Sequence, residues 1–484
     1  MIFNSVTYIV FLILIVLLYW ILPYRLRLLM LFLSSMAFYG FWRPEFLSVM
    51  LLSAVNDYAL SLLIYNTDSK SRKKFLLYIS LIVNLGLLFY FKYLLFFIDN
   101  FSVVLNVFGV PFESPALNII LPLGISFYTF QTISYTVDVY RGFLKPEKDF
   151  ILYGTFVMFF PQLVAGPILR AVELIDQLRE RPPFYLNDML EGCKRILYGL
   201  FLKVVLADNI APFVDEGFEM AISSLGALDV FTLSFLLGFQ IYFDFSAYSH
   251  IAIGSAKLLG ITFPENFNFP YAATSFKDFW KRWHISLSSW IRDYLYLPII
   301  GAKVMDKSTG GLDVSQTQIK KFNKDYALFI TWAIMGLWHG SSWTYVLWGI
   351  YHACVIFLER KLKPLRLKYR FYDKWLSWFI VLPVAMLSWI PFRADDLTQT
   401  FQMFAKLLQP TQYLFLGMRE NTYIVTALVL LLFCTAYFSQ TYLAETLNRK
   451  PVLKHAISTI HFAVLIILVF TFLRPINQFI YFQF

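Results

Sequence analysis

Charged residues are scarce in this chain. Asp, Glu, Lys and Arg together make up 15% of its 484 residues, while hydrophobic residues make up 58% and the mean hydropathy is +0.61. An ordinary soluble protein carries about 25% charged residues. The composition therefore excludes an ordinary soluble domain and predicts a protein that lies in a bilayer.

Cysteine is also rare, and metal-binding motifs are missing. The three cysteines, Cys193, Cys354 and Cys434, are far apart and lie in or beside apolar runs. Their spacing excludes a CxxC redox or zinc motif, so we expect them to pack as small apolar side chains. Since the sequence contains neither HExxH nor HxxxH, we expect no metal site.

Long apolar runs are what the chain has in abundance. Four of them, at 6–24, 75–91, 422–443 and 456–473, are almost free of charge, and a bilayer crossing needs roughly 17 to 25 mostly apolar residues. The first run has no preceding Lys or Arg and no small-residue cleavage site, so we expect it to stay as a membrane helix. The sequence predicts an all-α polytopic membrane protein.

The net charge of +10 comes from basic residues in short loops between apolar runs, such as Arg25, Arg27 and the segment 70–74. This distribution is typical of cytoplasmic loops and does not indicate a nucleic-acid partner. It predicts a periplasmic N-terminus, an external loop at 42–45, and contact with membrane lipids.

The chain is expected to form one integral membrane domain over 1–484 with three parts. Residues 1–98 read as four simple spans, and 371–484 as three further apolar runs. The central part, 121–360, is broken by Pro and Gly and carries ionisable groups, a pattern tolerated at membrane depth only within protein or beside a wet cavity. Two polar segments, 170–195 and 305–325, should lie outside the hydrocarbon.

A strongly amphipathic segment follows Ser275. Ser275 and Asp278 form a capping-box pattern that predicts a helix start. At about 100° per residue, one face is apolar: Phe276, Phe279, Trp280, Trp283, Leu287, Trp290, Ile291 and Tyr294. The opposite face is polar: Lys277, Asp278, Lys281, Arg282, Ser288, Ser289, Arg292 and Asp293. His284 falls at the boundary, where water meets apolar surface. An interfacial polar group, with the basic residues on lipid phosphates, is the simpler interpretation.

A second histidine, His339, stands at the end of a strongly apolar stretch. Gly340 is a natural helix stop, and Ser341 or Ser342 can cap the next helix. An ionisable side chain inside the membrane is a functional-site hypothesis by default, and imidazole is suited to moving protons near neutral pH. The alternative is a histidine satisfied by a backbone carbonyl.

The remaining ionisable groups in apolar surroundings are expected to be structural. We expect packing or interface roles for the lone histidines, which are His250, His352, His455 and His461. Asp244 lies among aromatic residues and needs a partner, and structural pairing is favoured over chemistry there.

These motifs resemble a known family. The segments DFWKRWHISLSSWIRDYLYLPI and MGLWHGSSWTYVLWGIYHA are similar to the two signature regions of the membrane-bound O-acyltransferase family. LPLGISFYTFQTISYTVDVYRG, FPQLVAGPILR, YFDFSAYSHIAIG and ENFNFPY resemble motifs of its bacterial branch, the alginate O-acetyltransferase type. The resemblance covers nearly the whole chain and is loosest after about Leu397. It implies a ring of about 10 to 12 transmembrane helices, with re-entrant and interfacial helices, around a central tunnel.

The resemblance also implies an acetyl relay in the bacterial inner membrane. Acetyl would come from cytoplasmic acetyl-CoA, a substrate rather than a bound cofactor, and pass to a periplasmic acetyltransferase or acceptor of the SGNH type that esterifies an alginate-like polysaccharide. Peptidoglycan is the alternative glycan. A transporter of polysaccharide or lipid-linked sugar is an alternative of another class, but such folds often have two related halves, and the sequence shows none. A non-catalytic scaffold would leave both histidine motifs without a purpose.

Within the family pattern, His339 matches the principal catalytic histidine and His284 the second active-site position. We expect His339 to be a general base and His284 to orient the donor or bind the oxyanion; a covalent acetyl-histidine is the other possible mechanism. Lys277, Lys281, Arg282 and Arg292 could attract CoA phosphates or lipid phosphates. The residues expected to line the donor path are Trp338, Gly340, Trp283, Asp244, Lys281, Arg282 and Ser288.

Overall fold

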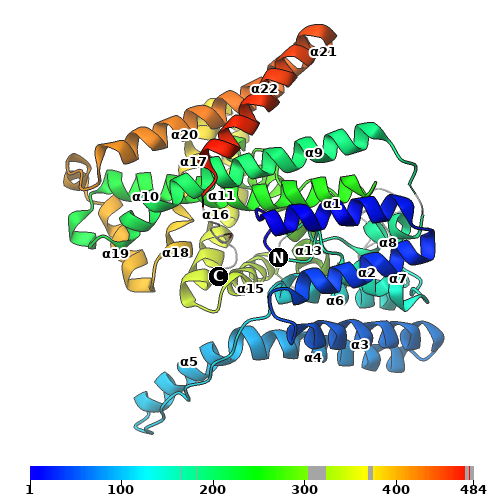
Figure 1. Ribbon diagram of the computed structural model, residues 1–484. Coiled ribbons are helices and arrows are strands. Elements are labelled where there is room, and N and C mark those ends of the chain that lie inside the picture. Colours follow the sequence, from blue (N-terminus) through cyan, green and yellow to red (C-terminus); the bar gives the residue numbers. More distant parts are fainter. Residues whose placement is uncertain (165, 181, 303–322, 369–373, 475–478, 480–484) are drawn as a thin grey trace.

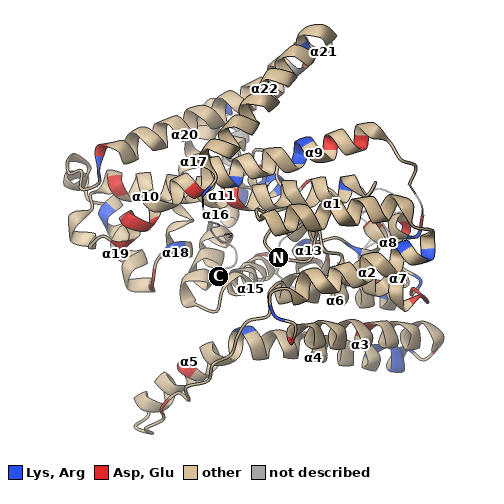
Figure 2. Ribbon diagram, viewed as in Figure 1, with Lys and Arg blue, Asp and Glu red and all other residues tan. Residues whose placement is uncertain are grey.

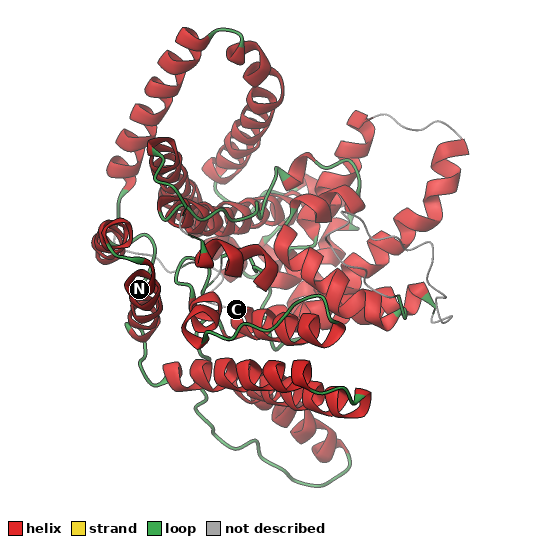
Figure 3. Cartoon of the chain, turned by 90° about the vertical axis from the view of Figure 1, so that its right-hand side faces the viewer, coloured by secondary structure: helices red, strands yellow, loops and turns green. Residues whose placement is uncertain are grey.

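The computed structural model describes residues 1–164, 166–180, 182–302, 323–368, 374–474 and 479. Within these residues every element of regular structure is a helix (Figure 3). This confirms the predicted all-α class. Most of the predicted polar loop at 305–325, and the end of the basic stretch at 361–370, lie outside the described residues.

The N-terminal part contains the four helical segments that the apolar runs predict. They are α1 (Val6–Ile21), α2 (Tyr24–Gly40), α3 (Phe46–Asn66), and a long helix formed by α4 (Lys70–Leu88), η1 (Phe89–Tyr93) and α5 (Leu94–Val107). The first begins where the Ser5 hydroxyl accepts a hydrogen bond from the Tyr8 N–H at 3.1 Å, a side-chain cap of the usual kind. The long helix contains a π-helical turn at η1 and extends past the predicted limit of residue 98.

The central part is built from short helices around one long helix. Its elements are α6 (Ile125–Arg141), α7 (Phe150–Met158), α8 (Ala171–Arg179), α9 (Leu186–Leu200), η2 (Phe201–Ala207), α10 (Asp208–Glu219), η3 (Ile222–Ser224), α11 (Ala227–Leu258), η4 (Pro270–Ala272), α12 (Phe276–Arg282), α13 (Ile285–Ile291), η5 (Arg292–Tyr296), α14 (Leu297–Ile299), α15 (Lys324–His339) and α16 (Trp343–Lys368).

The polar segment 170–195 forms two different elements. Its first half becomes the short helix α8, whereas its second half begins α9, which continues through η2 into α10. That continuous helix has 34 residues, or about 51 Å at 1.5 Å per residue, against a hydrocarbon thickness of about 30 Å. Its polar first turns therefore have enough length to extend beyond the hydrocarbon.

The C-terminal part contains the three predicted apolar runs, with short helices between them. Its elements are α17 (Lys374–Leu387), α18 (Ile390–Arg393), α19 (Leu397–Leu407), η8 (Pro410–Leu414), α20 (Glu420–Phe438), η9 (Ser439–Leu443), α21 (Ala444–Asn448) and α22 (Pro451–Phe472). The three runs correspond to α17, to α20 with η9, and to α22.

The helix α11 has 32 residues and lies in the middle part of the molecule (Figure 1). It packs against α9, η2 and α10, which precede it in the chain, and against α17, α19 and α20, which follow it. Its glycines allow close approach to α9: a Cβ at Gly254 would lie 2.7 Å from the carbonyl oxygen of Gly192. Small residues at such crossings are typical of helices packed in membranes.

Seven helices among the described residues are long and apolar enough to cross a membrane. They are Phe46–Asn66, Lys70–Val107, Leu186–Glu219, Ala227–Leu258, Lys374–Arg393, Glu420–Leu443 and Pro451–Phe472. Figure 2 shows long stretches without charge along α1, α20 and α22. The chain is thus a multi-pass membrane protein, while the count of 10 to 12 spans, the ring and the tunnel stay predictions.

Candidate active site

His339 is the last residue of α15 and is buried, with 7% of its surface exposed. Its ring packs edge-on against three aromatic rings, with centroid distances of 4.9 Å to Trp338, 4.8 Å to Trp348 and 5.3 Å to Phe392. The predicted position at a helix end, inside apolar surroundings, is confirmed. The imidazole is thus held among apolar rings at the point where the backbone leaves the helix.

Gly340 ends α15 as predicted, but for a different physical reason. The sequence suggested a glycine stop, which is commonly a left-handed residue, whereas Gly340 is extended at φ −159° and ψ 153°. What requires glycine is space, because a Cβ here would lie 2.1 Å from the ring of Tyr345. The predicted cap of the next helix is confirmed at Ser342, whose hydroxyl accepts from the Thr344 N–H at 3.3 Å.

Lys92 is a residue of this site that sequence reasoning missed. It lies in the π-helical turn η1, and its ammonium donates to the carbonyl oxygens of Trp338 at 2.5 Å and His339 at 3.1 Å. The last carbonyls of a helix lack intrahelical partners, so Lys92 caps the end of α15. Lys92 directly follows the apolar run 75–91 and precedes further apolar residues. This was the signal that could have found it, because charges at membrane depth mark functional sites.

The predicted continuous helix from Ser275 to Tyr294 is wrong. Its start is confirmed, since the Ser275 hydroxyl accepts from the Asp278 N–H at 3.0 Å, but α12 ends at Arg282 and α13 begins at Ile285. Between them Trp283 is extended, and His284 is left-handed at φ 40°, a conformation uncommon for a residue other than glycine.

Backbone hydrogen bonds from a neighbouring segment explain this break. The Asn268 N–H donates to the Arg282 carbonyl, and the Ile285 N–H donates to the Asn266 carbonyl, both at 2.9 Å. These bonds take up backbone groups that a continuous helix would have used internally. Tertiary pairing therefore overrides a periodicity that favours one helix.

The break also changes where His284 lies. We expected this histidine at the boundary between water and apolar surface, but it is buried with 1% of its surface exposed. Its Nδ1 lies 3.1 Å from Oδ1 of Asn266, and its ring contacts Phe245 edge-on at 4.7 Å. Asn266 itself is fully buried and was not singled out from the sequence.

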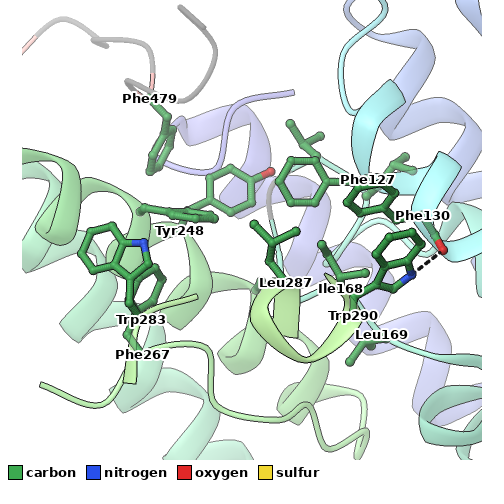
Figure 4. Packing of buried hydrophobic residues seen from close by; sticks show 14 of the residues in the cluster. Phe127, Phe130, Ile168, Leu169, Tyr248, Phe267, Trp283, Leu287, Trp290 and Phe479 are labelled. Carbon is green, nitrogen blue, oxygen red and sulfur yellow. Dashed lines mark hydrogen bonds between the residues drawn. The ribbon is translucent and has the colours of Figure 1, made fainter. Parts of the chain in front are cut away.

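The structure brings the two histidines into one aromatic cluster. Phe127 of α6 lies 6.5 Å from the ring of His284 and 5.8 Å from the ring of Trp338, which precedes His339. Figure 4 shows Phe127 beside Phe130 and the Trp290 ring, with Trp283 on the other side of the cluster.

A stack of three rings fixes the end of α15 against α13. Phe130 of α6 stacks on Trp290 at 3.8 Å and on Trp338 at 5.2 Å. The indole N–H of Trp290 donates to the Phe130 carbonyl at 2.9 Å (Figure 4). The helix that carries His339 and the helix that follows His284 are therefore joined through α6.

Other residues predicted along the donor path separate into two groups. Trp338 and Trp283 are buried in the aromatic cluster, and the Ser288 hydroxyl donates to the Trp283 carbonyl at 3.2 Å. Lys281, by contrast, is exposed, and Arg282 pairs with Asp278 at 3.0 Å.

Asp244 has the partner that its surroundings require. Its Oδ1 lies 2.7 Å from Nζ of Lys203 in η2, and both side chains are 2% exposed. The same ammonium lies 2.9 Å from Oδ1 of Asp208. The predicted structural pairing of Asp244 is thus confirmed, and the sequence did not indicate which residue supplies the charge.

Asp293, predicted on the polar face, is buried instead. Its carboxylate accepts from Arg170 at 2.7 Å and from Arg292 at 2.7 Å. Burial raises the pKa of Asp293, but the hydrogen bond from Arg292 and the charge of Arg170 outweigh burial, so the pKa of this carboxyl is below its usual value. These ion pairs anchor the segment that follows His284.

The remaining histidines divide between the core and the surface. His352 is fully buried, 4.7 Å from the Trp348 ring that also contacts His339, and His250 packs edge-on to Tyr198 at 4.8 Å. His455 and His461, on α22, are exposed. In the part of the chain that the structure describes, no group of three or more His, Cys, Asp or Glu side chains could hold a metal ion.

The fold and the site define a polytopic membrane protein in which two histidines are buried in one aromatic cluster. The model of MBOAT, the membrane-bound O-acyltransferase family, matches residues 145–390, which include both histidines. The chain belongs to this family, and it is an O-acyltransferase.

The names of similar proteins narrow the class of reaction. The chain is 36% identical over 397 residues to "Probable alginate O-acetylase AlgI" of Azotobacter vinelandii, covering 81% of this chain and 74% of that protein. It is 35% identical over 398 residues to "Peptidoglycan O-acetyltransferase" of Helicobacter pylori, covering 77% and 72%. A "Teichoic acid D-alanyltransferase" of Streptococcus thermophilus is 30% identical over 322 residues, covering 61% and 75%. Names of two of these relatives refer to O-acetylation, which supports membrane O-acetylation as the reaction class.

Proposed function

We propose that this protein takes acetyl from cytoplasmic acetyl-CoA and relays it across the bacterial inner membrane for O-acetylation of an extracellular polysaccharide of the alginate type. The observation that carries the proposal is the burial of His339 and His284 in one aromatic cluster of a multi-pass membrane protein. Acetyl-CoA carries phosphates that cannot cross hydrocarbon, and the glycan lies on the other side. A reactive centre within the membrane solves this problem.

In the proposed reaction His339 is the general base. Its imidazole takes the proton of the acceptor hydroxyl as the hydroxyl oxygen attacks the thioester carbon. The C–O bond forms, the C–S bond breaks, and the CoA thiolate leaves and takes up a proton. General-base catalysis of this kind contributes roughly 10²- to 10⁴-fold. The alternative, a covalent acetyl-histidine, predicts a burst of CoA release without acceptor.

The donor phosphates are proposed to meet basic residues around α12. Arg282 and Arg292 already pair with Asp278 and Asp293, so the exposed Lys277 and Lys281 are the better candidates. Replacing both by Ala should raise KM for acetyl-CoA with little change in kcat. If these lysines bind lipid phosphates instead, KM for acetyl-CoA stays unchanged and binding to anionic lipid falls.

The test uses purified protein in detergent. Free CoA release from acetyl-CoA is measured for wild type, His339→Ala and His455→Ala, with and without candidate acceptors. His455 is an exposed histidine on α22 and serves as the matched control. We expect His339→Ala to bind acetyl-CoA but to lose turnover, while His455→Ala behaves as wild type. Wild-type CoA release by a folded His339→Ala protein would contradict the general-base assignment.

The acceptor is proposed to be a periplasmic acetyltransferase or acetyl-acceptor protein of the SGNH type. Support comes from the relatives named for alginate and peptidoglycan O-acetylation. Adding such a protein with alginate-like polymer or with peptidoglycan to the detergent assay distinguishes the two glycans, because the matching pair should raise CoA release. The periplasmic N-terminus is tested by labelling single cysteines, placed in the 42–45 loop or in the first turns of α4 at 70–74, from either side of the membrane.

A further inference from the structure

Four hydrogen bonds fix the environment of the Asn266 side chain. Its Oδ1 accepts from the hydroxyl of Ser286 at 2.8 Å and from the backbone N–H of Ser286 at 3.3 Å, and it lies 3.1 Å from Nδ1 of His284. Its Nδ2 donates to the Ser249 hydroxyl at 3.1 Å. Asn266 is fully buried and His284 is 1% exposed, so water does not compete for these bonds.

The orientation of the Asn266 amide follows from the Ser286 backbone. A backbone N–H can only donate, so the atom that it meets has to be the amide oxygen rather than the amide nitrogen. The Ser286 hydroxyl accepts from the Ile168 N–H at 3.0 Å. Because the Asn266 oxygen can only accept, this hydroxyl donates its own hydrogen to Asn266.

This geometry determines the tautomer of His284. Because Oδ1 of Asn266 is an acceptor, Nδ1 of His284 has to donate. A neutral imidazole carries one hydrogen, so Nε2 is left with a lone pair. Among the described residues Nε2 has no hydrogen-bond partner although it is buried, and a buried polar atom without a partner is costly. The neutral side chain can therefore accept a hydrogen bond but cannot donate one to an oxyanion.

We propose that Asn266 is a positioning residue that holds His284 in the Nδ1–H tautomer, so that Nε2 accepts a hydrogen bond from an N–H or O–H group of a substrate. This inference rests on the proposed function. His339 takes the proton of the attacking hydroxyl, so the group bound by His284 is a different one: an amide of the pantetheine arm, or a second hydroxyl of the acceptor. A separate backbone bond, from the Ile285 N–H to the Asn266 carbonyl, fixes the chain next to the left-handed His284.

The experiment compares two substitutions of Asn266. Asn266→Leu keeps a similar volume without an acceptor, and Asn266→Asp keeps the acceptor oxygen. Asn84→Leu is the matched control, because Asn84 is also buried and donates to Asp57 at 2.6 Å, in the N-terminal helices. Steady-state CoA release gives kcat and KM for acetyl-CoA and for the acceptor separately. Nitrogen-15 NMR of histidine-labelled protein reports the tautomer, with His284→Ala identifying the signal.

For folded protein we expect Asn266→Leu to lower kcat/KM by about 10- to 100-fold, the range typical of groups that orient a functional histidine. For Asn266→Asp, kcat/KM should stay within about 5-fold of the wild-type value, and the proton should stay on Nδ1 of His284. Asn84→Leu should leave kcat/KM per folded molecule unchanged. A change confined to KM for acetyl-CoA identifies the pantetheine amide as the group bound by His284. A change confined to KM for the acceptor identifies a hydroxyl of the acceptor as that group.

Several results would overturn the proposal. Wild-type kcat/KM in folded Asn266→Leu or in His284→Ala excludes a positioning role, and a proton on Nε2 in wild type or in Asn266→Asp excludes the tautomer. If Asn266→Leu does not fold, the tautomer observed by NMR in wild type and in Asn266→Asp still tests the proposal. If wild type releases no CoA with any acceptor, the proposed function fails, whereas the NMR readout still tests whether Asn266 fixes the tautomer.

Discussion

His339 and His284 reach the same aromatic cluster by different means. His339 ends a regular helix, and its ring is surrounded by three aromatic side chains, with Lys92 on its backbone carbonyls. His284 lies in a break between two short helices, and a hydrogen bond to Asn266 orients its ring. For His284, the hydrogen bond to a fixed acceptor also determines the imidazole tautomer. In the proposed function, His339 transfers the proton and His284 orients a group of the substrate.

The first prediction tests this division of roles directly. His339→Ala should lower kcat by roughly 10²- to 10⁴-fold, as expected for loss of a general base, whereas His284→Ala should lower it by about 10- to 100-fold. Since both act on one step, the double variant should be little worse than His339→Ala alone. Steady-state CoA release by folded protein measures kcat for the two single variants and for the double variant. Equal losses of kcat in the two single variants would contradict the different roles proposed for His339 and His284.

A second prediction concerns the helix end that holds His339. Gly340→Ala places a methyl group against the Tyr345 ring, and Tyr345 contacts Phe392, which packs on His339. We expect kcat to fall by about 10-fold, in line with an overpacking cost of about 1 to 3 kcal/mol. Adding Tyr345→Leu should restore most of the loss. A double variant no better than Gly340→Ala would show that the glycine is needed for another reason.

Lys92→Met is the third test. Met keeps an apolar stem but removes the two hydrogen bonds to the carbonyls of Trp338 and His339. Hydrogen bonds from a charged donor contribute about 1.5 to 3 kcal/mol, so thermal stability should fall, and kcat should fall by about 5-fold as His339 loses its fixed position. For Lys92→Arg, which retains hydrogen-bond donors, thermal stability and kcat should lie between those of wild type and those of Lys92→Met. Unchanged stability in Lys92→Met would exclude the capping role.

The smallest effect on turnover is expected at the anchor behind His284. The pKa of Asp293 is lower in the folded chain than its usual value, so the ionised carboxylate stabilises the fold above the unfolded pKa of about 4. This contribution is lost as the pH falls through the lower, folded pKa. Asp293→Asn should lower thermal stability near neutral pH and change kcat by less than about 3-fold. The stability difference between the two proteins should shrink on acidification; a constant difference would contradict the assignment.

The sequence predicts features that depend on local composition. Apolar runs predict the N-terminal and C-terminal helices, and the apolar stretch followed by glycine predicts that His339 ends a helix. Features that depend on distant residues were missed: the periodicity after Ser275 favours one helix, and the break arises from hydrogen bonds with residues 266–268. For the same reason Asp244 could be expected to pair, but Lys203 could not be identified as its partner.

The burial of α11 has a consequence for how the chain is made. The most apolar window of α11 is 94% buried, and its mean hydropathy of 1.4 is the lowest of the seven candidate spans. The helices α17, α19 and α20 that cover part of it follow it in the chain, so its packing partners are complete only after these helices have been synthesised. Lys203, however, precedes Asp244 in the chain. The counter-charge of Asp244 is thus already synthesised when the carboxylate is made.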